Sequence, residues 1–372
     1  MLKKFVVDLS PDQKAMILSL FGPTDTAYSS MMRQMISQMM KDRHLPVMDI
    51  DSYLKVYQVF NFNAFELGAH GHGVFAEFTR FSHSCAPNCS YSFRGTAVYC
   101  HARKSIQNGE ELTISYKKKW DLEPTHERRY LNLQSKDFTC HCPRCDAIGD
   151  DMRQFDCFDP NCKGVMMVCQ PINKRPILLT GRQYTGVTYV EPHLLPCTVC
   201  HRAAPADYQT KMFELETWMH EQGPRLVKEF TDFVCQSKNA KKESELMELL
   251  YLPNHRRHVV ALPFLRTRMK LSAFLLLTEE DTSPHALADA NQAALEFVTA
   301  LFQLLPFPSD NLSDELSDLV NAVPILSPNT ERIVCGEALR MYLLLYGRDR
   351  RTEVLDAAML RYREKNPSVQ ST

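Results

Sequence analysis

The chain has 372 residues, a formal net charge of −1 and a hydrophobic fraction of 44%. This length and composition allow two or three domains with proper hydrophobic cores. The near-zero charge argues against bulk electrostatic capture of nucleic acid or of an anionic membrane. No stretch approaches about 18 consecutive apolar residues, and the N-terminal segment turns polar too early for a secretory signal. We therefore expect a soluble intracellular protein, in the nucleus, the cytoplasm or both.

Three helices are expected before residue 62. Ser10, Pro11 and Gln13 have the pattern of an N-cap, a first-turn proline and a capping box, which predicts a helix over residues 10–20. Two more helices are expected over residues 27–41 and 50–61. Methionines recur at helical spacing in the second of these and predict a stripe that faces the core. The methionines of this stripe are Met31, Met32, Met35, Met39 and Met40.

Residues 73–116 predict a compact β region, because short aromatic and β-branched segments alternate there with Gly, Pro and Asn. From residue 206 to the end the apolar spacing is helical again. Separate helices are expected over 210–222 and 229–237, with four further helical segments after them. Prolines are expected to break this region. These breakers are Pro253, Pro284, Pro306 and Pro328, and the helical segments are 259–278, 285–305, 331–347 and 353–365.

The cysteines predict metal binding. There are thirteen in the chain, and eight of them fall between residues 140 and 200. In a reducing compartment, clustered cysteines at short spacings indicate metal ligands before disulfides. Residues 140–202 also show little periodicity, so we expect a segment that is held together by metal.

Cys140, Cys142 and Cys145 form a C-x-C-x2-C triplet. Three thiolates leave tetrahedral zinc one ligand short, so a fourth ligand must come from elsewhere in the fold. Cys85 and Cys89 are the candidates. Either one would tie the β region to the cysteine-rich segment.

A second zinc site is predicted from a C-x4-C pair and a later C-x2-C pair. His193, His201 and Cys169 are alternative ligands, and a partition that joins Cys142 and Cys145 to the first pair also fits the spacing. Neither set shows the open coordination position of a catalytic metal, so two structural zinc ions are expected. The second set is Cys157, Cys162, Cys197 and Cys200.

Three ordered motifs carry a resemblance to a known family. FSHSCAPNC at 81–89, GEELTISY at 109–116 and FTCHCPRC at 138–145 resemble the second half of a SET domain and its post-SET cysteines. The arrangement is most similar to that of the SET-and-MYND lysine methyltransferases. This resemblance implies an α+β fold: the C-terminal half of a SET-type β-fold with a helical insertion, a cysteine-rich post-SET zinc segment and an all-α C-terminal domain. The implied boundaries are 1–62, 63–136, 137–205 and 206–372.

The resemblance also implies roles for single residues. Tyr116 would direct its hydroxyl toward the methyl group of S-adenosylmethionine and the target amine. Ser82, His83 and Phe138 would contact this cofactor, with Phe138 over the adenine ring, and so would Asn63. The fourth ligand of the first zinc would be Cys85. Asn88 would hold the knotted turn in which one chain segment passes under another.

The sequence departs from the family pattern in three places. Ser82 stands where the family has an asparagine ahead of His-Ser-Cys, so weaker cofactor binding is expected. The aromatic residue that precedes the post-SET triplet and walls the lysine channel is not obvious, and Lys136 stands close to its place. The family's N-terminal SET half and MYND finger are not found ahead of residue 63, which implies either a truncated gene model or a protein that keeps half of the catalytic domain.

The favoured hypothesis is an S-adenosylmethionine-dependent protein-lysine N-methyltransferase that acts on a histone or another protein. The alternative is a catalytically impaired, SET-derived, zinc-binding scaffold whose helical C-terminal domain binds proteins. Nucleic-acid binding rests only on the lysine run at 117–120, which is more typical of a solvated strand end. No direct nucleic-acid or membrane partner is therefore expected.

Overall fold

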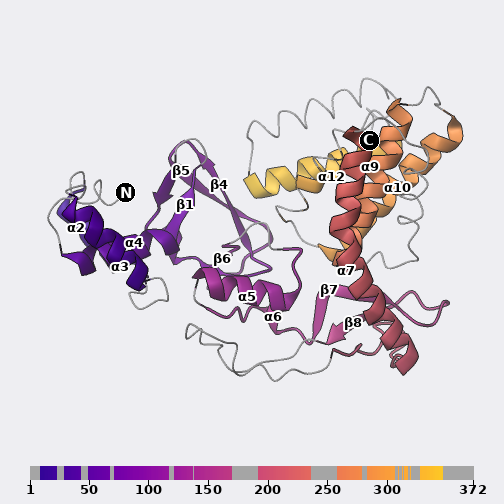
Figure 1. Ribbon diagram of the computed structural model, residues 1–372, viewed down its shortest axis with the longest axis horizontal. Coiled ribbons are helices and arrows are strands. Elements are labelled where there is room, and N and C mark those ends of the chain that lie inside the picture. The colour runs from indigo at the N-terminus through magenta and orange to yellow at the C-terminus, as the bar shows by residue number, and fades with distance from the viewer. Residues whose placement is uncertain are drawn as a thin grey trace.

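The computed structural model gives a mixed α and β fold that extends from an N-terminal group of helices to a C-terminal one (Figure 1). Strand pairs and short helices lie between the two groups. The structure describes residues 9–22, 29–42, 49–67, 71–116, 121–136, 138–169, 192–235, 258–278, 283–305, 309, 312, 314–316, 319 and 327–346.

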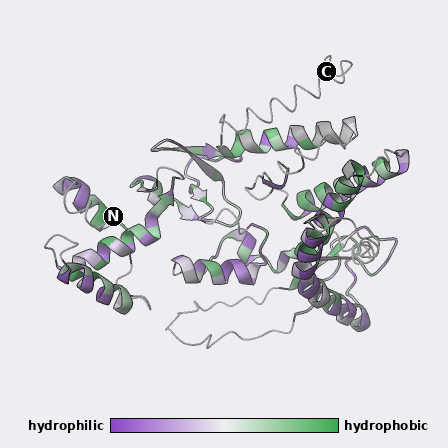
Figure 2. Ribbon diagram, turned by 45° about the horizontal axis from the view of Figure 1, so that its top comes forward, coloured by the Kyte–Doolittle hydropathy of each residue, from purple (hydrophilic) through white to green (hydrophobic). Residues whose placement is uncertain are grey.

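The N-terminal group contains three helices, as the sequence predicted. In the first, the Ser10 hydroxyl accepts from the Gln13 N–H and the Gln13 side chain accepts from the Ser10 N–H, so the capping box is confirmed. The helices pack around Ile36, Tyr53 and Leu54, which are fully buried. In Figure 2 this group shows green and purple faces, as amphipathic helices should. The helices are α2 (Pro11–Ser19), α3 (Ser29–Lys41) and α4 (Ile50–Asn63).

The predicted methionine stripe of α3 is partly wrong. Met32 is buried, but Met31 is 53% exposed and Met35 is 42% exposed. Met32 and Ile36 are four residues apart, so they share the face that packs on α4. Met31 and Met35 precede them by one residue each and are therefore turned about 100° away from that face.

The β region is confirmed as a set of short paired strands. β1 pairs with β2, and β4 forms a hairpin with β5, both antiparallel. β3 and β6 pair in parallel, with Ser82 opposite Thr113 and His83 opposite Ile114. These elements are β1 (Ala64–Glu66), β2 (His72–Val74), η2 (Phe78–Arg80), β3 (Ser82–His83), β4 (Cys89–Arg94), β5 (Ala97–Ala102) and β6 (Thr113–Ile114).

Asn88 links the two motifs that contain the strands of this parallel pair. Its side chain is buried, and its amide nitrogen donates to the Glu110 carboxylate at 3.0 Å and to the Glu111 carbonyl at 2.8 Å. Its amide oxygen accepts from the Thr113 N–H at 2.8 Å. Few residues other than asparagine can donate and accept in this way from one planar group. Asn88 therefore fixes the register of β6 against β3.

The middle segment holds more regular structure than the sequence analysis expected. A hairpin crosses residues 149–169, and α5 precedes the cysteine triplet. The hairpin escaped detection because its pairing is interrupted by a register shift between Asp150 and Gln154. The elements are α5 (Thr125–Lys136), α6 (Pro143–Asp146), β7 (Gly149–Asp156) and β8 (Val165–Cys169).

The C-terminal region is helical as predicted, with two corrections. The two helices expected over 210–222 and 229–237 are one helix, α7 (Ala206–Cys235), and Pro224 lies inside it. Met219 and Leu226, on either side of Pro224, pack on Phe264, so tertiary packing keeps the helix continuous. Pro284 and Pro328 begin helices and do not break them, because proline suits the first turn. Pro253, Pro306 and residues 353–365 lie outside the described residues.

One C-terminal helix reaches back to the β region. α12 (Pro328–Tyr346) packs on the β4–β5 hairpin, and the Ser90 hydroxyl donates to the Leu344 carbonyl at 3.2 Å (Figure 1). The other C-terminal elements are η4 (Val259–Ala261), α9 (Leu262–Thr278) and α10 (Pro284–Leu304). Among the described helices, none is long and apolar enough to cross a membrane.

A buried ion-pair group connects the middle segment to the C-terminal helices. Glu216 on α7 accepts two hydrogen bonds from Arg153 of β7, at 2.6 and 2.8 Å, and contacts His258 Nε2 at 3.0 Å. Burial disfavours the charged carboxylate, but hydrogen bonds from His258 and Arg153 outweigh it and lower the pKa of Glu216 to about 2. The ionised carboxylate is therefore the form that holds these elements together.

We predict that Asn88→Ala lowers the free energy of unfolding by about 3 kcal/mol, because it leaves the Thr113 N–H and the Glu111 carbonyl without their buried partner. Urea unfolding at neutral pH measures the change. Asn108→Ala is the control, since Asn108 is exposed in the same motif region. Equal stability of the two variants would contradict the role assigned to Asn88.

We predict that Glu216→Gln is less stable than the wild type by about 3 kcal/mol at pH 7. Because the folded pKa is lower than the ordinary value of 4.5, the wild type gains this stability above pH 4.5 and loses it as the pH falls toward 2. The measured quantity is the stability difference between variant and wild type as a function of pH, which cancels effects of acid on other groups. Glu221→Gln, at an exposed position, serves as the control. A gap that stays constant down to pH 3 would count against the assignment.

Candidate functional site

The parallel strand pair brings the first two motifs together at Tyr116. Its backbone N–H donates to His83 Nδ1 at 3.1 Å, and its hydroxyl donates to the Phe81 carbonyl at 2.7 Å. Burial, followed by the charge of Glu111, raises the pKa of Tyr116. The phenol is therefore protonated at neutral pH and acts as a hydrogen-bond donor.

His83 lies between this tyrosine and the cysteines. Because Nδ1 accepts from the Tyr116 N–H, the neutral ring carries its proton on Nε2, which lies 3.3 Å from Cys85 Sγ. Burial lowers the pKa of His83 to about 4, so the ring is neutral at pH 7. One imidazole thus joins the candidate site to the cysteine cluster. Its neighbour Ser82 donates to the Glu111 carboxylate at 2.5 Å.

Phe138 completes an aromatic group with these two residues. Its ring centroid lies 5.6 Å from that of His83 and 6.1 Å from that of Tyr116, the second pair being edge-to-face. Such spacings are typical of favourable aromatic contacts. The third motif therefore meets the first two in space, although Phe138 follows Tyr116 by 22 positions in the sequence.

Two cavities adjoin at Tyr116 and Phe138, which line both of them. The smaller, of about 450 Å³, is also lined by Ser82 and His83. The larger, of about 790 Å³, is also lined by Asn63. Both volumes lie in the range of small-molecule sites. The residues predicted to contact the cofactor are therefore divided between two neighbouring spaces with a shared aromatic wall.

Asn63 has a structural task as well. It is the last residue of α4, and its amide nitrogen donates to the Phe21 carbonyl at 2.6 Å and to the Val59 carbonyl at 2.7 Å. These bonds fix the side chain at the edge of the larger cavity. A ligand there would meet a pre-positioned amide.

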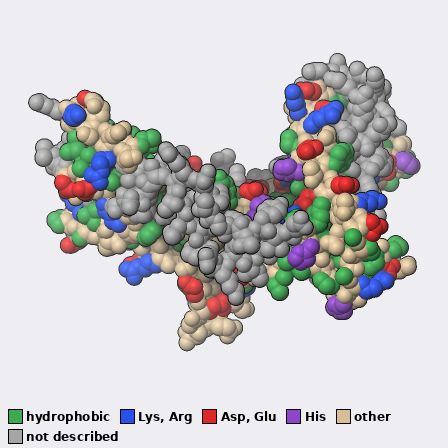
Figure 3. Space-filling view, turned by 60° about the horizontal axis from the view of Figure 1, so that its bottom comes forward, with side chains coloured by type: hydrophobic (Ala, Val, Ile, Leu, Met, Phe, Trp, Pro, Cys, Tyr) green, Lys and Arg blue, Asp and Glu red, His purple; other side chains and the backbone are tan. Residues whose placement is uncertain are grey.

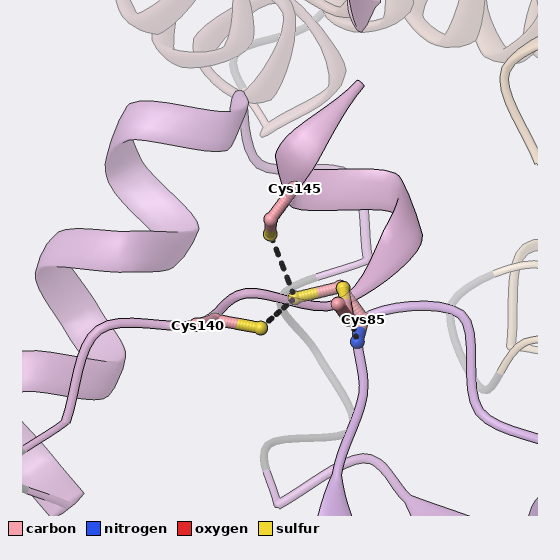
Figure 4. Close-up of side chains that lie close together, drawn as sticks. Cys85, Cys140 and Cys145 are labelled. Carbon is pink, nitrogen blue, oxygen red and sulfur yellow. Dashed lines mark hydrogen bonds between the residues drawn. The ribbon is translucent and has the colours of Figure 1, made fainter. Parts of the chain in front are cut away.

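The four cysteines of the first expected zinc site come together around one point. Cys85, from the turn after β3, meets the triplet of the third motif, and the four sulfur atoms lie within 4.8 Å of one another. Cys140 Sγ is 3.9 Å and Cys145 Sγ is 3.5 Å from Cys85 Sγ (Figure 4). All four residues are buried. Of the two candidates for the fourth position, the structure brings Cys85 and not Cys89 to this cluster.

Hydrogen bonds among the sulfurs make the cluster suited to a cation. Contacts with Cys140, and then with Cys145 and Cys85, lower the pKa of Cys142, whereas contacts with Cys140 and Cys142 raise that of Cys85. Four thiolates in close contact form one of the usual ligand sets of structural zinc, and these residues fit that set.

Three arginines support this cluster, and sequence reasoning missed them. Arg129 donates to the carbonyls of Cys140 and Cys145, and Arg144 donates to the carbonyl of Cys85. Burial opposes the charge of Arg128, but Asp151 and the nearby cysteines raise its pKa. Arg128 and Arg129 lie in α5, and the sequence of such a short, polar helix is typical of an exposed surface helix. No sequence signal therefore marked these arginines.

The second cysteine set also comes together, in the partition that the pair spacing favoured. Cys157 Sγ lies 3.7 Å from Cys200 Sγ, and Cys162 Sγ lies 3.6 Å from Cys197 Sγ. The backbone N–H groups of Gly164 and Val199 donate to sulfur. His193, His201 and Cys169 do not belong to this group.

Gly164 shows how tightly the chain is folded around this second cluster. A Cβ atom at this position would stand 2.4 Å from Cys197 Sγ, so only glycine fits. The N–H of Arg202, and then its side chain, lower the pKa of Cys200 to about 6, while burial raises that of Cys157 to about 12. The donor set again fits tetrahedral zinc.

Comparisons with known proteins identify one segment of this chain. The family model of the SET domain matches residues 16–117. This part of the chain is a SET domain segment. It runs from α2 through the parallel strand pair to the residue after Tyr116, so the N-terminal helices belong to the match. The resemblance read from the three motifs is confirmed.

Curated relatives of the SET segment carry lysine methyltransferase names. The chain is 33% identical over 114 residues to N-lysine methyltransferase SMYD2 of Homo sapiens, and the match covers 29% of this chain and 26% of that protein. It is 37% identical over 87 residues to histone-lysine N-methyltransferase SMYD3 of Mus musculus, and this match covers 23% of this chain and 20% of that protein. A third relative is histone-lysine N-methyltransferase SET5 of Eremothecium gossypii, 32% identical over 102 residues, covering 26% and 19%. The chain thus spans about a quarter of the length of the relatives it matches.

We predict that serine variants separate the two cysteine clusters. Cys142→Ser should lower zinc content and weaken binding of the expected cofactor, S-adenosylmethionine, beside Tyr116. The reason is that the first cluster holds Cys85 next to His83. Cys162→Ser should lower zinc content by the same amount and leave ligand binding unchanged. Cys169→Ser is the matched control, since Cys169 lies outside both groups. Zinc is measured by elemental analysis of purified protein, and full zinc content in either cluster variant would contradict this assignment.

Proposed function

We propose that this protein is an S-adenosylmethionine-dependent protein-lysine N-methyltransferase. The observation that carries the proposal is the wall of Tyr116 and Phe138, which lines two adjoining cavities. Methyl transfer joins two molecules that approach from opposite sides of one reacting carbon. Two spaces that share a tyrosine in their walls suit such a reaction, because catalysis of this kind rests mainly on proximity and orientation.

The residues around the smaller cavity suit the adenosine part of the cofactor. Phe138 contributes an aromatic ring to the wall of this space, and Ser82 and His83 line it as well. Asn63, at the edge of the larger cavity, would also contact the cofactor. When bound, S-adenosylmethionine supplies a methyl group on a positively charged sulfur atom.

Tyr116 would be the catalytic residue. Its phenol is held protonated by burial, and its ring is fixed by contacts with His83 and Phe138. The hydroxyl, which now donates to the Phe81 carbonyl, is a polar group that can orient the reacting atoms. A target amine must reach it unprotonated, and a largely apolar aromatic wall favours the neutral form of an amine.

The substrate would be a lysine side chain of a histone or of another protein, since both kinds of substrate appear in the names of the relatives. We place the protein in the nucleus, the cytoplasm or both. The helical C-terminal domain would bind protein partners. On the face drawn in Figure 3, the described charges of both signs are interspersed.

We also propose that the two cysteine clusters hold two structural zinc ions. In the first site the ligands would be Cys85 and the triplet of the third motif, and in the second the two cysteine pairs around Gly164. The first ion would lie next to His83, so the metal and the cofactor site would be built on one turn. Each cluster supplies four sulfur ligands, which is the full set for a tetrahedral structural zinc ion.

A second candidate function is a SET-derived scaffold that binds proteins without methylating them. Lys136 favours it, because this side chain lies in the larger cavity where a substrate lysine would have to enter. Cofactor affinity separates the two functions. A scaffold has no need for a cofactor, whereas a methyltransferase requires it.

We predict that S-adenosylmethionine binds the zinc-loaded 372-residue chain and that Phe138→Ala abolishes the binding. Tyr116→Phe should lower methyl transfer to a lysine peptide by about 100-fold, because it removes one oriented polar group from the reacting centre. Calorimetry measures binding, and incorporation of labelled methyl groups measures turnover. Tyr99→Phe, an exposed tyrosine on β5, is the control. A folded, zinc-loaded chain that does not bind the cofactor would support the scaffold.

A further inference from the structure

Lys136 extends its side chain into the larger cavity. It is the last residue of α5 and lines that space together with Tyr116 and Phe138. Its ammonium donates to the Phe62 carbonyl at 2.6 Å. The nitrogen also lies 5.9 Å from the centre of the Phe62 ring and 5.8 Å from that of Tyr116.

This surrounding has the chemistry of an ammonium-binding site. A carbonyl oxygen accepts one N–H, and two aromatic rings within about 6 Å attract the positive charge by their electron-rich faces. The contacts join residues far apart in the sequence, since Phe62 belongs to α4 and Tyr116 follows β6. Lys136 therefore occupies a site that is built by the fold.

Lys136 lies on one side of the aromatic wall only. It lines the larger cavity but not the smaller one, where Ser82 and His83 lie. A second ammonium in the larger cavity would meet the charge of Lys136 at close range, and like charges repel each other. An external lysine and Lys136 therefore exclude each other.

We propose that Lys136 is an internal ligand of the acceptor side: its ammonium occupies the place beside Tyr116 that a substrate lysine must take. This inference rests on the proposed function and names the regulation of that same site. Substrate entry then requires displacement of the Lys136 side chain from Phe62 and Tyr116. The chain thus carries its own competitor. Lys136 lowers the affinity of the acceptor side for a substrate lysine, and a weakly binding lysine does not displace it.

The test uses the zinc-loaded full chain saturated with S-adenosylhomocysteine and, in parallel, free of it. The probe is n-butylammonium chloride, which reproduces the end of a lysine side chain, and its binding is followed by ligand-observed NMR. Lys136→Met removes the charge and keeps a side chain of similar length. It should bind the probe about tenfold more tightly than the wild type does. Lys136→Arg retains a cation and should behave like the wild type, as should Lys104→Met, whose lysine is exposed on the surface.

A second measurement needs no bound ligand. Acetic anhydride should modify Lys136 about tenfold more slowly than Lys104, because the Lys136 amine is held by a carbonyl and two rings. Peptide mass spectrometry reports both rates in one sample. Phe62→Ala removes one ring and should bring the rate at Lys136 closer to that at Lys104.

Two results would overturn the inference. One is equal probe binding by the wild type and Lys136→Met. The other is weaker binding of S-adenosylhomocysteine by Lys136→Met with unchanged binding of 5′-methylthioadenosine, which would make Lys136 a ligand of the cofactor carboxylate. If neither the wild type nor any variant binds S-adenosylhomocysteine, the proposed function fails. Probe binding in the ligand-free sample and the acetylation rates then still decide whether the Lys136 ammonium occupies the site beside Tyr116.

Discussion

The candidate site depends on the parallel pairing of two very short strands, β3 and β6. Two residues on each side are too few to hold a register by themselves, and parallel pairs need a connection that brings distant segments together. The buried amide of Asn88 provides what the strands lack, because it bonds to the segment before β6 in both donor and acceptor roles. With that register fixed, the Tyr116 N–H meets His83, and the phenol points to Phe81.

The first cysteine cluster adds the third motif to this arrangement. Cys85 follows His83 by two residues, so any ion held by Cys85 and the triplet brings Phe138 close to Tyr116. Arg129 of α5 and Arg144 of α6 hold the carbonyls of the same cysteines, which sets the backbone before a metal binds. The proposed catalytic and structural roles are thus joined in one turn, and a fault in the proposed metal site is expected to reach the proposed cofactor site.

Lys136 alters what this arrangement can do. An aromatic residue in its place would only narrow the channel, whereas a lysine also brings a charge that the Phe62 carbonyl and two rings accept. The same cavity would therefore suit either of the two proposed functions: a methyltransferase that must expel an internal competitor, or a scaffold whose acceptor site is filled. The affinity of the chain for the cofactor and for a simple alkylammonium ion distinguishes these states.

The sequence by itself determined the local features: the capping box at Ser10, the β region, the helical C-terminal part and the two cysteine sets, since each follows from residue type and short spacing. It also marked Tyr116, His83 and Phe138 through ordered motifs. Only the tertiary structure decided the rest. Whether Met31 or Met32 faces the core, whether Pro224 ends a helix, and whether Lys136 points to water or to Phe62 depend on what packs against each residue. Such contacts come from segments distant in the chain, and no local pattern encodes them.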